Sequence, residues 1–173
     1  NQQFDIITEI VKKTVAVITE MNIHVDILVQ KCAELMGLEN GKVFGTGCFL
    51  DTSRLISVLA NYTGLRNEVI KVDIIGEHGD TQLPVWSKAT IAGVPIDEYC
   101  ADIGLEWNET IKKEMEENVK TMGAQIISAK GKTHYGIATC VCYLADAILS
   151  QRPTICSVAS PFHGEYGIKG VAL

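Results

Sequence analysis

Apolar and polar positions alternate along the first quarter of the chain with the periods of short helices and strands. Residues 4–11 place their apolar side chains on one helical face, and the apolar run 15–18 predicts a buried strand. The pattern over residues 25–36 predicts an amphipathic helix that Gly37 ends, and residues 42–44 predict a second strand. Strand, helix and strand in this order predict a βαβ unit with a parallel sheet.

The middle of the chain predicts shorter elements. A glycine-rich turn at 45–47 leads into a helical pattern over residues 51–62, and the apolar run 72–75 predicts a strand. The alternating run 85–91, which ends before Gly93, predicts a hairpin or an edge strand.

Two long helices follow. Asn108 is a suitable N-cap for a helix that runs to about residue 129. Charges at pairing distance on this helix favour a solvated face, with pairs at Lys112 and Glu116, Lys113 and Glu117, and Glu116 and Lys120. Residues 133–149 are apolar nearly all round, so we expect a buried helix. Residues 154–159 predict a strand, and the turn at 162–164 should lead to another.

Composition and charge restrict the function classes. Hydrophobic residues make up 47% of the 173 residues and charged residues 21%, as in a globular domain with a real core. The net charge of -6 and the lack of a basic cluster argue against nucleic acid as a partner. No apolar run is long enough to cross a bilayer, so we expect no membrane partner.

The six cysteines form no CxxC pair, and most lie in apolar stretches. They are therefore interpreted as free thiols of a cytoplasmic protein. The spacing of Cys140 and Cys142 on a helix does not suit zinc, and we expect no metal site.

The strongest chemical signal is the segment 74–80, Ile-Ile-Gly-Glu-His-Gly-Asp. It places His78 between two carboxylates in a glycine-bracketed turn that follows a strand. A histidine beside an acid can move a proton near neutral pH. A surface histidine in a polar loop is the alternative interpretation.

A second signal stands at the start of a predicted helix, where Asp51 and Arg54 are three positions apart and share a face. A helix cap with a helix-surface ion pair would explain both residues. Alternatively, Arg54 could hold a substrate carboxylate through two hydrogen bonds, and Asp51 could accept a hydrogen bond from His78. That set suits a 2-oxo acid, whose reduction needs a hydride donor such as a nicotinamide.

Four motifs together carry a family resemblance: Leu-Asp-x-x-Arg at 50–54, Gly-Glu-His-Gly-Asp at 76–80 followed by Pro-Val-Trp-Ser, Lys-Gly-x-Thr at 130–133, and Gly-x-Tyr-Gly-Ile-Lys at 164–169. On these residues the chain resembles the NAD-dependent L-lactate dehydrogenase and malate dehydrogenase family nearly end to end. The resemblance implies a fold that is α/β to α+β. It implies that residues 1–45 are the tail of a Rossmann-type NAD-binding domain, and that residues 46–173 are a catalytic domain incomplete at its C-terminus.

The resemblance also implies roles for single residues. His78 is expected to be the proton donor and acceptor, Asp51 its partner and Arg54 the carboxylate clamp. Thr133 is expected to line the substrate pocket, as in the lactate enzymes, although it could equally cap the last long helix. Thr46 is expected to approach the nicotinamide of NAD.

One segment departs from the family pattern. Where the family has Ser-Asn-Pro-Val-Asp, this chain has Asn-Ile-His-Val-Asp at 22–26. Ile23 stands at the position of the asparagine that contacts cofactor and substrate, and His24 at the proline. Asn22, one position early, is the remaining cofactor-binding candidate. His24 is interpreted as a packing or surface residue.

The preferred function is therefore an NAD-dependent L-2-hydroxyacid dehydrogenase, with lactate and pyruvate favoured and a homodimer or homotetramer expected. The phosphate-binding G-x-G-x-x-G loop and the loop that sets substrate choice are expected upstream of Asn1, so this chain alone should be inactive. A malate or branched-chain 2-hydroxyacid dehydrogenase is the alternative within this class. Two alternatives belong to other classes: the chain could be an inert fragment that self-associates, or, as a more distant alternative, a hydrolase that uses Asp51 and His78.

Overall fold

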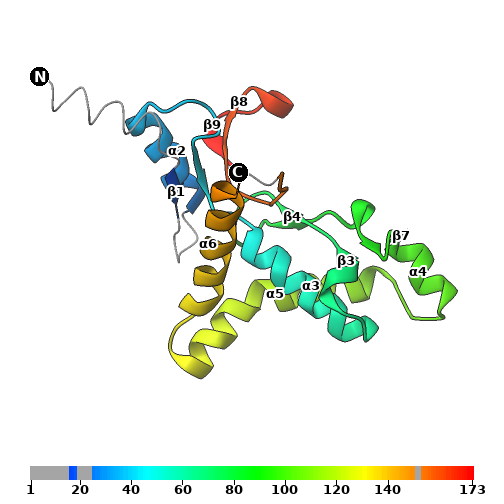
Figure 1. Cartoon of the computed structure of the whole chain (residues 1–173). Helices are drawn as coiled ribbons and strands as arrows, with labels where there is room; N and C mark the ends of the chain where they lie inside the picture. Colours follow the sequence, from blue (N-terminus) through cyan, green and yellow to red (C-terminus); the bar gives the residue numbers. More distant parts are fainter. Residues whose placement is uncertain (1–15, 19–24, 151–152) are drawn as a thin grey trace, which may run out of the picture.

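The computed structural model describes residues 16–18, 25–150 and 153–173 (Figure 1). Strand β1 (Ala16–Ile18), helix α2 (Val25–Met36) and strand β2 (Val43–Gly45) come first. The two strands are parallel, with Ala16 opposite Val43, which confirms the predicted βαβ unit. The helix predicted over residues 4–11 lies outside the described residues.

Two helices form the centre of the fold. Helix α3 (Phe49–Thr63) packs against helix α5 (Glu109–Lys130), and Figure 1 shows them side by side. The Asn108 side chain accepts two backbone N–H bonds of 3.0 Å at the start of α5, which confirms the predicted cap. The main hydrophobic core lies around these helices and includes Leu55, Leu59, Ile74, Ile91, Met115 and Val119.

Short antiparallel strands flank this core. Strands β3 (Ile70–Lys71), β6 (Thr90–Ile91) and β7 (Val94–Pro95) form one sheet, and the β6–β7 turn confirms the predicted hairpin. Strand β4 (Ile74–Ile75) pairs with β5 (Leu83–Pro84), and helix α4 (Ile96–Asp102) follows β7.

Only the end of the alternating run 85–91 belongs to the predicted hairpin. Trp86–Lys88 form a 3-10 helix instead, and only Thr90–Ile91 pair in a sheet. The Trp86 indole N–H donates to Glu116 of α5 at 2.7 Å. This contact joins the 3-10 segment to helix α5.

The predicted charge pairs on α5 were also wrong where the structure tests them. Lys112 contacts Glu109 at 3.0 Å and Asp97 at 3.5 Å rather than Glu116. Glu116 instead accepts the hydrogen bond from Trp86. Lys112 thus pairs one turn back on its own helix, with Glu109, and with Asp97 of α4, and a tertiary partner occupies Glu116. Local pairs are worth only about 0.2–0.5 kcal/mol each, so such exchanges cost little.

The C-terminal segment contains one hairpin. Strands β8 (Pro161–His163) and β9 (Lys169–Ala172) are antiparallel. The predicted second strand is therefore present, but the turn lies at Gly164–Gly167 rather than at 162–164, because Phe162 and His163 belong to β8. The strand predicted over residues 154–159 was wrong. Within the described chain, its only sheet-like contact is the bridge in which Ala159 exchanges two backbone hydrogen bonds with Gly45, at 2.8 and 3.1 Å.

Helix α6 (His134–Leu149) was predicted to be buried, and this was wrong. Within the helix only Cys140 and Leu144 are buried, whereas Tyr135 is 71% exposed and Leu149 is 82% exposed. The helix packs mainly on α3, so the described residues cover one side of it. No helix in the described part of the chain combines the length and apolar character that a membrane span requires.

A second, smaller core joins α2 to the C-terminal hairpin. It contains Val25, Val29, Ala159 and Ala172. Helix α2 of the predicted βαβ unit therefore packs against strands β8 and β9. The bridge between Gly45 and Ala159 joins the same C-terminal segment to the turn at residues 45–47.

We predict that Gly47→Ala lowers the free energy of unfolding by about 3 kcal/mol, from strain at positive φ and overpacking. Gly47 has φ +47°, and an added Cβ would lie 2.4 Å from the Ala159 nitrogen. Gly64 has φ +70° with nothing within 4 Å of an added Cβ. As a matched control, Gly64→Ala should cost about 1 kcal/mol through strain alone. Urea denaturation measures both, and equal losses would contradict the close approach at Gly47.

Candidate active site

A cavity of about 270 Å³ lies between the start of α3, the turn after β4, and helices α5 and α6. Its volume is near the lower end of the range for small-molecule sites, which is about 300–1,000 Å³. Five predicted site residues line it: Thr46, Asp51, Arg54, His78 and Thr133. Other residues in the wall, which were not predicted as site residues, include Gly47, Gly79, Asp80, Gln82, Lys120 and Gly123.

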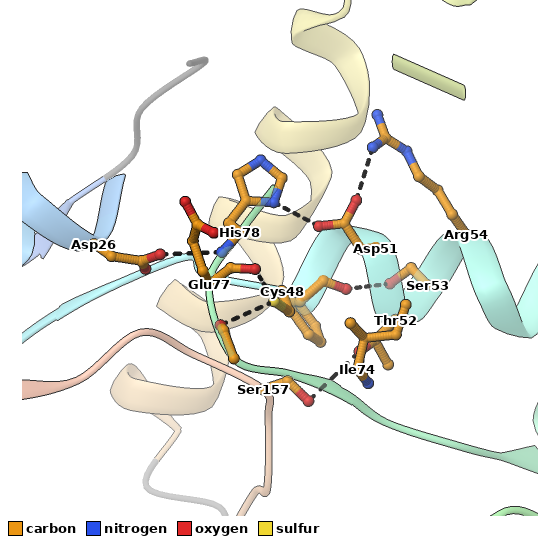
Figure 2. Close-up of polar contacts among 12 residues, drawn as sticks. Asp26, Cys48, Asp51, Thr52, Ser53, Arg54, Ile74, Glu77, His78 and Ser157 are labelled. Atoms are coloured by element: carbon orange, nitrogen blue, oxygen red, sulfur yellow. Dashed lines mark hydrogen bonds and ion pairs between the residues drawn. The ribbon is translucent and has the colours of Figure 1, made fainter. Parts of the chain in front are cut away.

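Asp51 connects the two cationic candidates. Its Oδ2 lies 2.6 Å from His78 Nδ1, and its Oδ1 accepts a hydrogen bond of 3.0 Å from an Arg54 N–H (Figure 2). The Asp51 side chain is only 3% exposed, so both charged contacts are shielded from water. The bond to Nδ1 leaves Nε2 as the ring nitrogen with no protein partner among the described residues. The structure therefore brings together the three residues that the two motifs predicted.

Backbone contacts fix the turn that carries His78. The Ile74 N–H donates to the Thr52 hydroxyl at 2.9 Å, which joins β4 to the first turn of α3. The Cys48 thiol donates to the Gly76 carbonyl at 3.4 Å. Gly76 itself has φ +89°, a conformation that favours glycine. The position of the imidazole relative to Asp51 thus depends on main-chain bonds as well as on the side-chain pair.

Asp26 is a site residue that sequence reasoning missed. Its Oδ2 accepts a hydrogen bond of 3.0 Å from the His78 backbone N–H, and its Oδ1 is buried without a partner. In sequence it is an acid in the first turn of α2, where acids commonly stabilise a helix terminus. Because it lies 52 positions before His78, no local pattern identified the contact.

The electrostatics of the site favour a charged His78. The hydrogen bond with Asp51 raises the pKa of His78, although burial opposes the rise. The negative charges of Asp51 and Asp26 raise that pKa further, and the nearby Arg54 lowers it. Burial raises the pKa of Asp26. A raised folded-state pKa of His78 stabilises the fold below the ordinary value of 6.5, and this stabilisation is lost as the pH rises through the folded value.

The thiol of Cys48 stays protonated at neutral pH. Burial, with the nearby charges of Asp51, Asp26 and Glu77, raises the pKa of its thiol to about 12. A thiolate is the nucleophilic form of cysteine, so Cys48 is unsuited to nucleophilic catalysis. The hydrolase alternative therefore gains no nucleophile from Cys48, whose thiol contacts the turn that carries His78.

The two threonine candidates lie in the cavity wall. Thr133 is at the N-cap position of α6, but its side chain makes no capping hydrogen bond. The alternative role of Thr133 as a hydroxyl cap is therefore not realised. Thr46 is 3% exposed beside Gly47. Asn22, Ile23 and His24 lie outside the described residues. Within the described ranges, no three His, Cys, Asp or Glu side chains are grouped as metal ligands.

Comparison with known proteins identifies the domain type. Residues 48–173 match the lactate/malate dehydrogenase, alpha/beta C-terminal domain. An L-lactate dehydrogenase of Thermoanaerobacterium saccharolyticum is 39% identical over 149 residues, which are 86% of this chain and 48% of that protein. An L-lactate dehydrogenase of Clostridium perfringens is 37% identical over 169 residues, which are 97% of this chain and 53% of that protein. The chain spans about half the length of these curated relatives.

Solved structures agree with this match. The L-lactate dehydrogenase of Clostridium thermocellum superposes with a TM-score of 0.78 at 35% identity, covering 99% of this chain and 57% of that one. A minor L-lactate dehydrogenase from Enterococcus mundtii, in a ligands-bound form, gives a TM-score of 0.83 at 29% identity, covering 97% and 55%.

We predict that Asp51→Asn lowers the His78 pKa, because the variant removes the negative charge of the acceptor and turns a charge-assisted hydrogen bond to the imidazolium into a weaker neutral one. NMR titration of the His78 ring signals measures this pKa directly. Asp80→Asn is the matched control, since Asp80 lines the same cavity without an ion pair among the described residues. A His78 pKa that Asp51→Asn leaves unchanged would contradict the assigned pair.

Proposed function

Because this chain belongs to the lactate/malate dehydrogenase family, we propose that it carries the catalytic residues of an oxidoreductase of the L-lactate dehydrogenase type. The reaction interconverts a small 2-oxo acid and its 2-hydroxy acid, with pyruvate and lactate favoured. One observation carries the proposal: a single buried carboxylate, Asp51, holds His78 and Arg54 in the wall of one cavity.

Arg54 binds the substrate carboxylate in this proposal. One of its N–H groups donates to Asp51, and that contact fixes the direction of the planar guanidinium. The remaining N–H donors can form paired hydrogen bonds with a carboxylate in the cavity. Because the arginine side chain is only 14% exposed, those bonds are shielded from competing water.

His78 transfers the proton. With Nδ1 held by Asp51, a protonated Nε2 donates to the carbonyl oxygen of the 2-oxo acid. In the reverse direction, the neutral ring accepts the proton of the 2-hydroxyl group. The raised pKa of His78 suits the reductive direction at neutral pH, because it keeps the donor proton on the ring.

NAD is the proposed cofactor, and its nicotinamide supplies the hydride when bound. The small buried side chain of Thr46, in the cavity wall beside Gly47, fits an approach of the nicotinamide ring, and Asn22 is proposed as a further contact. We assign residues 1–45 to the nucleotide-binding domain and 46–173 to the catalytic domain. The 173 residues contain no G-x-G-x-x-G motif for the pyrophosphate, so we expect no turnover by this chain alone.

Two further assignments complete the proposal. Thr133 is placed next to the substituent on C2 of the substrate, where a small side chain favours pyruvate over bulkier 2-oxo acids. The assembly is proposed to be a homodimer or homotetramer. Exposed apolar side chains on α6, among them Tyr135, Tyr143 and Leu149, support this, because such patches commonly mark subunit contacts.

The carboxylate clamp can be tested on the chain itself. Titration with pyruvate, followed by NMR at the His78 ring, should give saturable shifts with a dissociation constant on the order of millimolar, as expected for a few charged contacts. Arg54→Gln should abolish the shifts. Arg66→Gln should leave them unchanged, because the Arg66 side chain is 85% exposed and pairs with Glu68 outside the cavity. Equal shifts in wild type and Arg54→Gln would refute the proposed clamp.

A further inference from the structure

A second cavity, of about 800 Å³, lies between helix α2 and the end of strand β9. One face of α2, the turn after β4 and the last residues of the chain form its wall. It shares no lining residue with the cavity that contains Arg54 and His78. Its volume falls within the range of small-molecule sites, which is about 300–1,000 Å³.

Two buried oxygen atoms in this wall, Asp26 Oδ1 and Gln30 Oε1, have no hydrogen-bond partner among the described residues. Asp26 is only 7% exposed, and its other oxygen accepts the His78 backbone N–H (Figure 2). The Gln30 amide nitrogen donates to Glu34 at 3.0 Å, so the carbonyl oxygen is the free end of that amide. Buried acceptors are costly without donors, so these two oxygens indicate a place for a ligand's donor group.

The wall of this second cavity carries an excess of negative charge. Among the described lining residues, Lys31 is the only cation, and it pairs with Glu34 at 2.8 Å. Asp26 and Glu77 make no ion pair in the part of the chain that the structure describes. Burial raises the pKa of Asp26 and the charge of Glu77 raises it further, although the hydrogen bond from His78 opposes the rise. A positive charge in the cavity would compensate the two carboxylates.

Apolar side chains in the same wall favour an organic cation over a metal ion. Ile27 of α2 is 65% exposed and Val171 of β9 is 43% exposed, and both line the cavity. Within residues 16–18, 25–150 and 153–173, no three His, Cys, Asp or Glu side chains are grouped as metal ligands. A bare ion would leave the volume and the apolar surface unused, whereas an apolar body attached to a cation would bury that surface.

We propose that this second cavity binds an organic ammonium compound, a primary amine with an apolar body, whose ammonium donates to Asp26 Oδ1 and Gln30 Oε1. Positions four apart on a helix have Cβ atoms about 5–6 Å from each other, so one ammonium with three N–H donors can serve both oxygens. The apolar body packs against Ile27 and Val171. Because Asp26 also holds the His78 N–H, the bound amine contacts the residue that fixes the His78 turn.

Two molecules of nearly equal size test this site on the 173-residue chain. 2-Phenylethylammonium and 2-phenylethanol differ in the charge of the polar head. Backbone amide signals of His78 and Val171 are followed by NMR in about 0.15 M NaCl, which screens the general attraction of amines to a chain of net charge -6. We expect saturable shifts with the amine, with a dissociation constant on the order of millimolar. The alcohol should bind at least about tenfold more weakly, because it forms no charged hydrogen bond.

Variants of the two oxygens identify the contacts. Asp26→Asn removes the charge but keeps an acceptor for the His78 N–H, and it should weaken amine binding about tenfold. Gln30→Met removes the second oxygen at similar size and should weaken binding about threefold or more. Glu39→Gln, which changes an exposed acid outside the cavity, should leave the affinity unchanged. Urea denaturation confirms that each variant folds.

The competing outcomes are distinct. Equal binding of the amine and the alcohol, an absence of shifts with the amine, or an affinity that neither Asp26→Asn nor Gln30→Met changes would each overturn the proposed site. Displacement of the amine by calcium chloride would overturn it in favour of a metal site. The pyruvate titration at Arg54 tests the proposed function separately, because the two cavities share no lining residue.

Discussion

The buried carboxylate of Asp51 is the interaction on which the rest of the site depends. A charge that is only 3% exposed is stable in a protein interior when cations and hydrogen-bond donors surround it, and here His78 and Arg54 both do so. Removing one partner of a buried ion pair typically costs about 3–5 kcal/mol, because the other charge is left uncompensated. The same contacts orient the imidazole and the guanidinium, so the folding requirement and the chemical requirement coincide in one side chain.

The surrounding fold holds Asp51 and the His78 turn in position. Thr52, next to Asp51, accepts the Ile74 N–H, and Asp26 accepts the His78 N–H, so hydrogen bonds from main-chain N–H groups hold both the His78 turn and the strand before it (Figure 2). Ser157 extends the network, because its hydroxyl donates to Asp73 at 3.1 Å and lies 3.5 Å from the Thr52 hydroxyl. The α2 segment and the C-terminal segment therefore contribute to a site whose reactive groups lie between them in sequence.

Local patterns predicted the elements whose stability is local. The bounds of α2, the Asn108 cap and the β6–β7 turn follow from periodicity, capping and turn chemistry within a few residues. The grouping of Asp51, Arg54 and His78 could also be predicted, because Asp51 and Arg54 are three apart on one helix and the resemblance to the family motifs joined them to His78. Contacts between residues that lie far apart in the sequence, and that no motif marks, could not be predicted. The 3-10 helix at Trp86–Lys88 is joined to α5 by the bond from Trp86 to Glu116, and neither this bond nor the contact between Asp26 and the His78 turn has a local signature. The apolar faces of α6 predicted burial, but hydrophobicity alone does not identify what covers a helix, and the described chain covers one side of it.

The central claim is that Asp51 is shared between His78 and Arg54, and the His78 pKa in an Arg54→Gln variant tests it most directly. Arg54 lowers that pKa by charge repulsion and occupies one oxygen of the shared carboxylate. Its removal should therefore raise the His78 pKa above the wild-type value, as followed by NMR titration of the ring. A His78 pKa that falls or stays the same in this variant would contradict the shared carboxylate and show that the two contacts are independent.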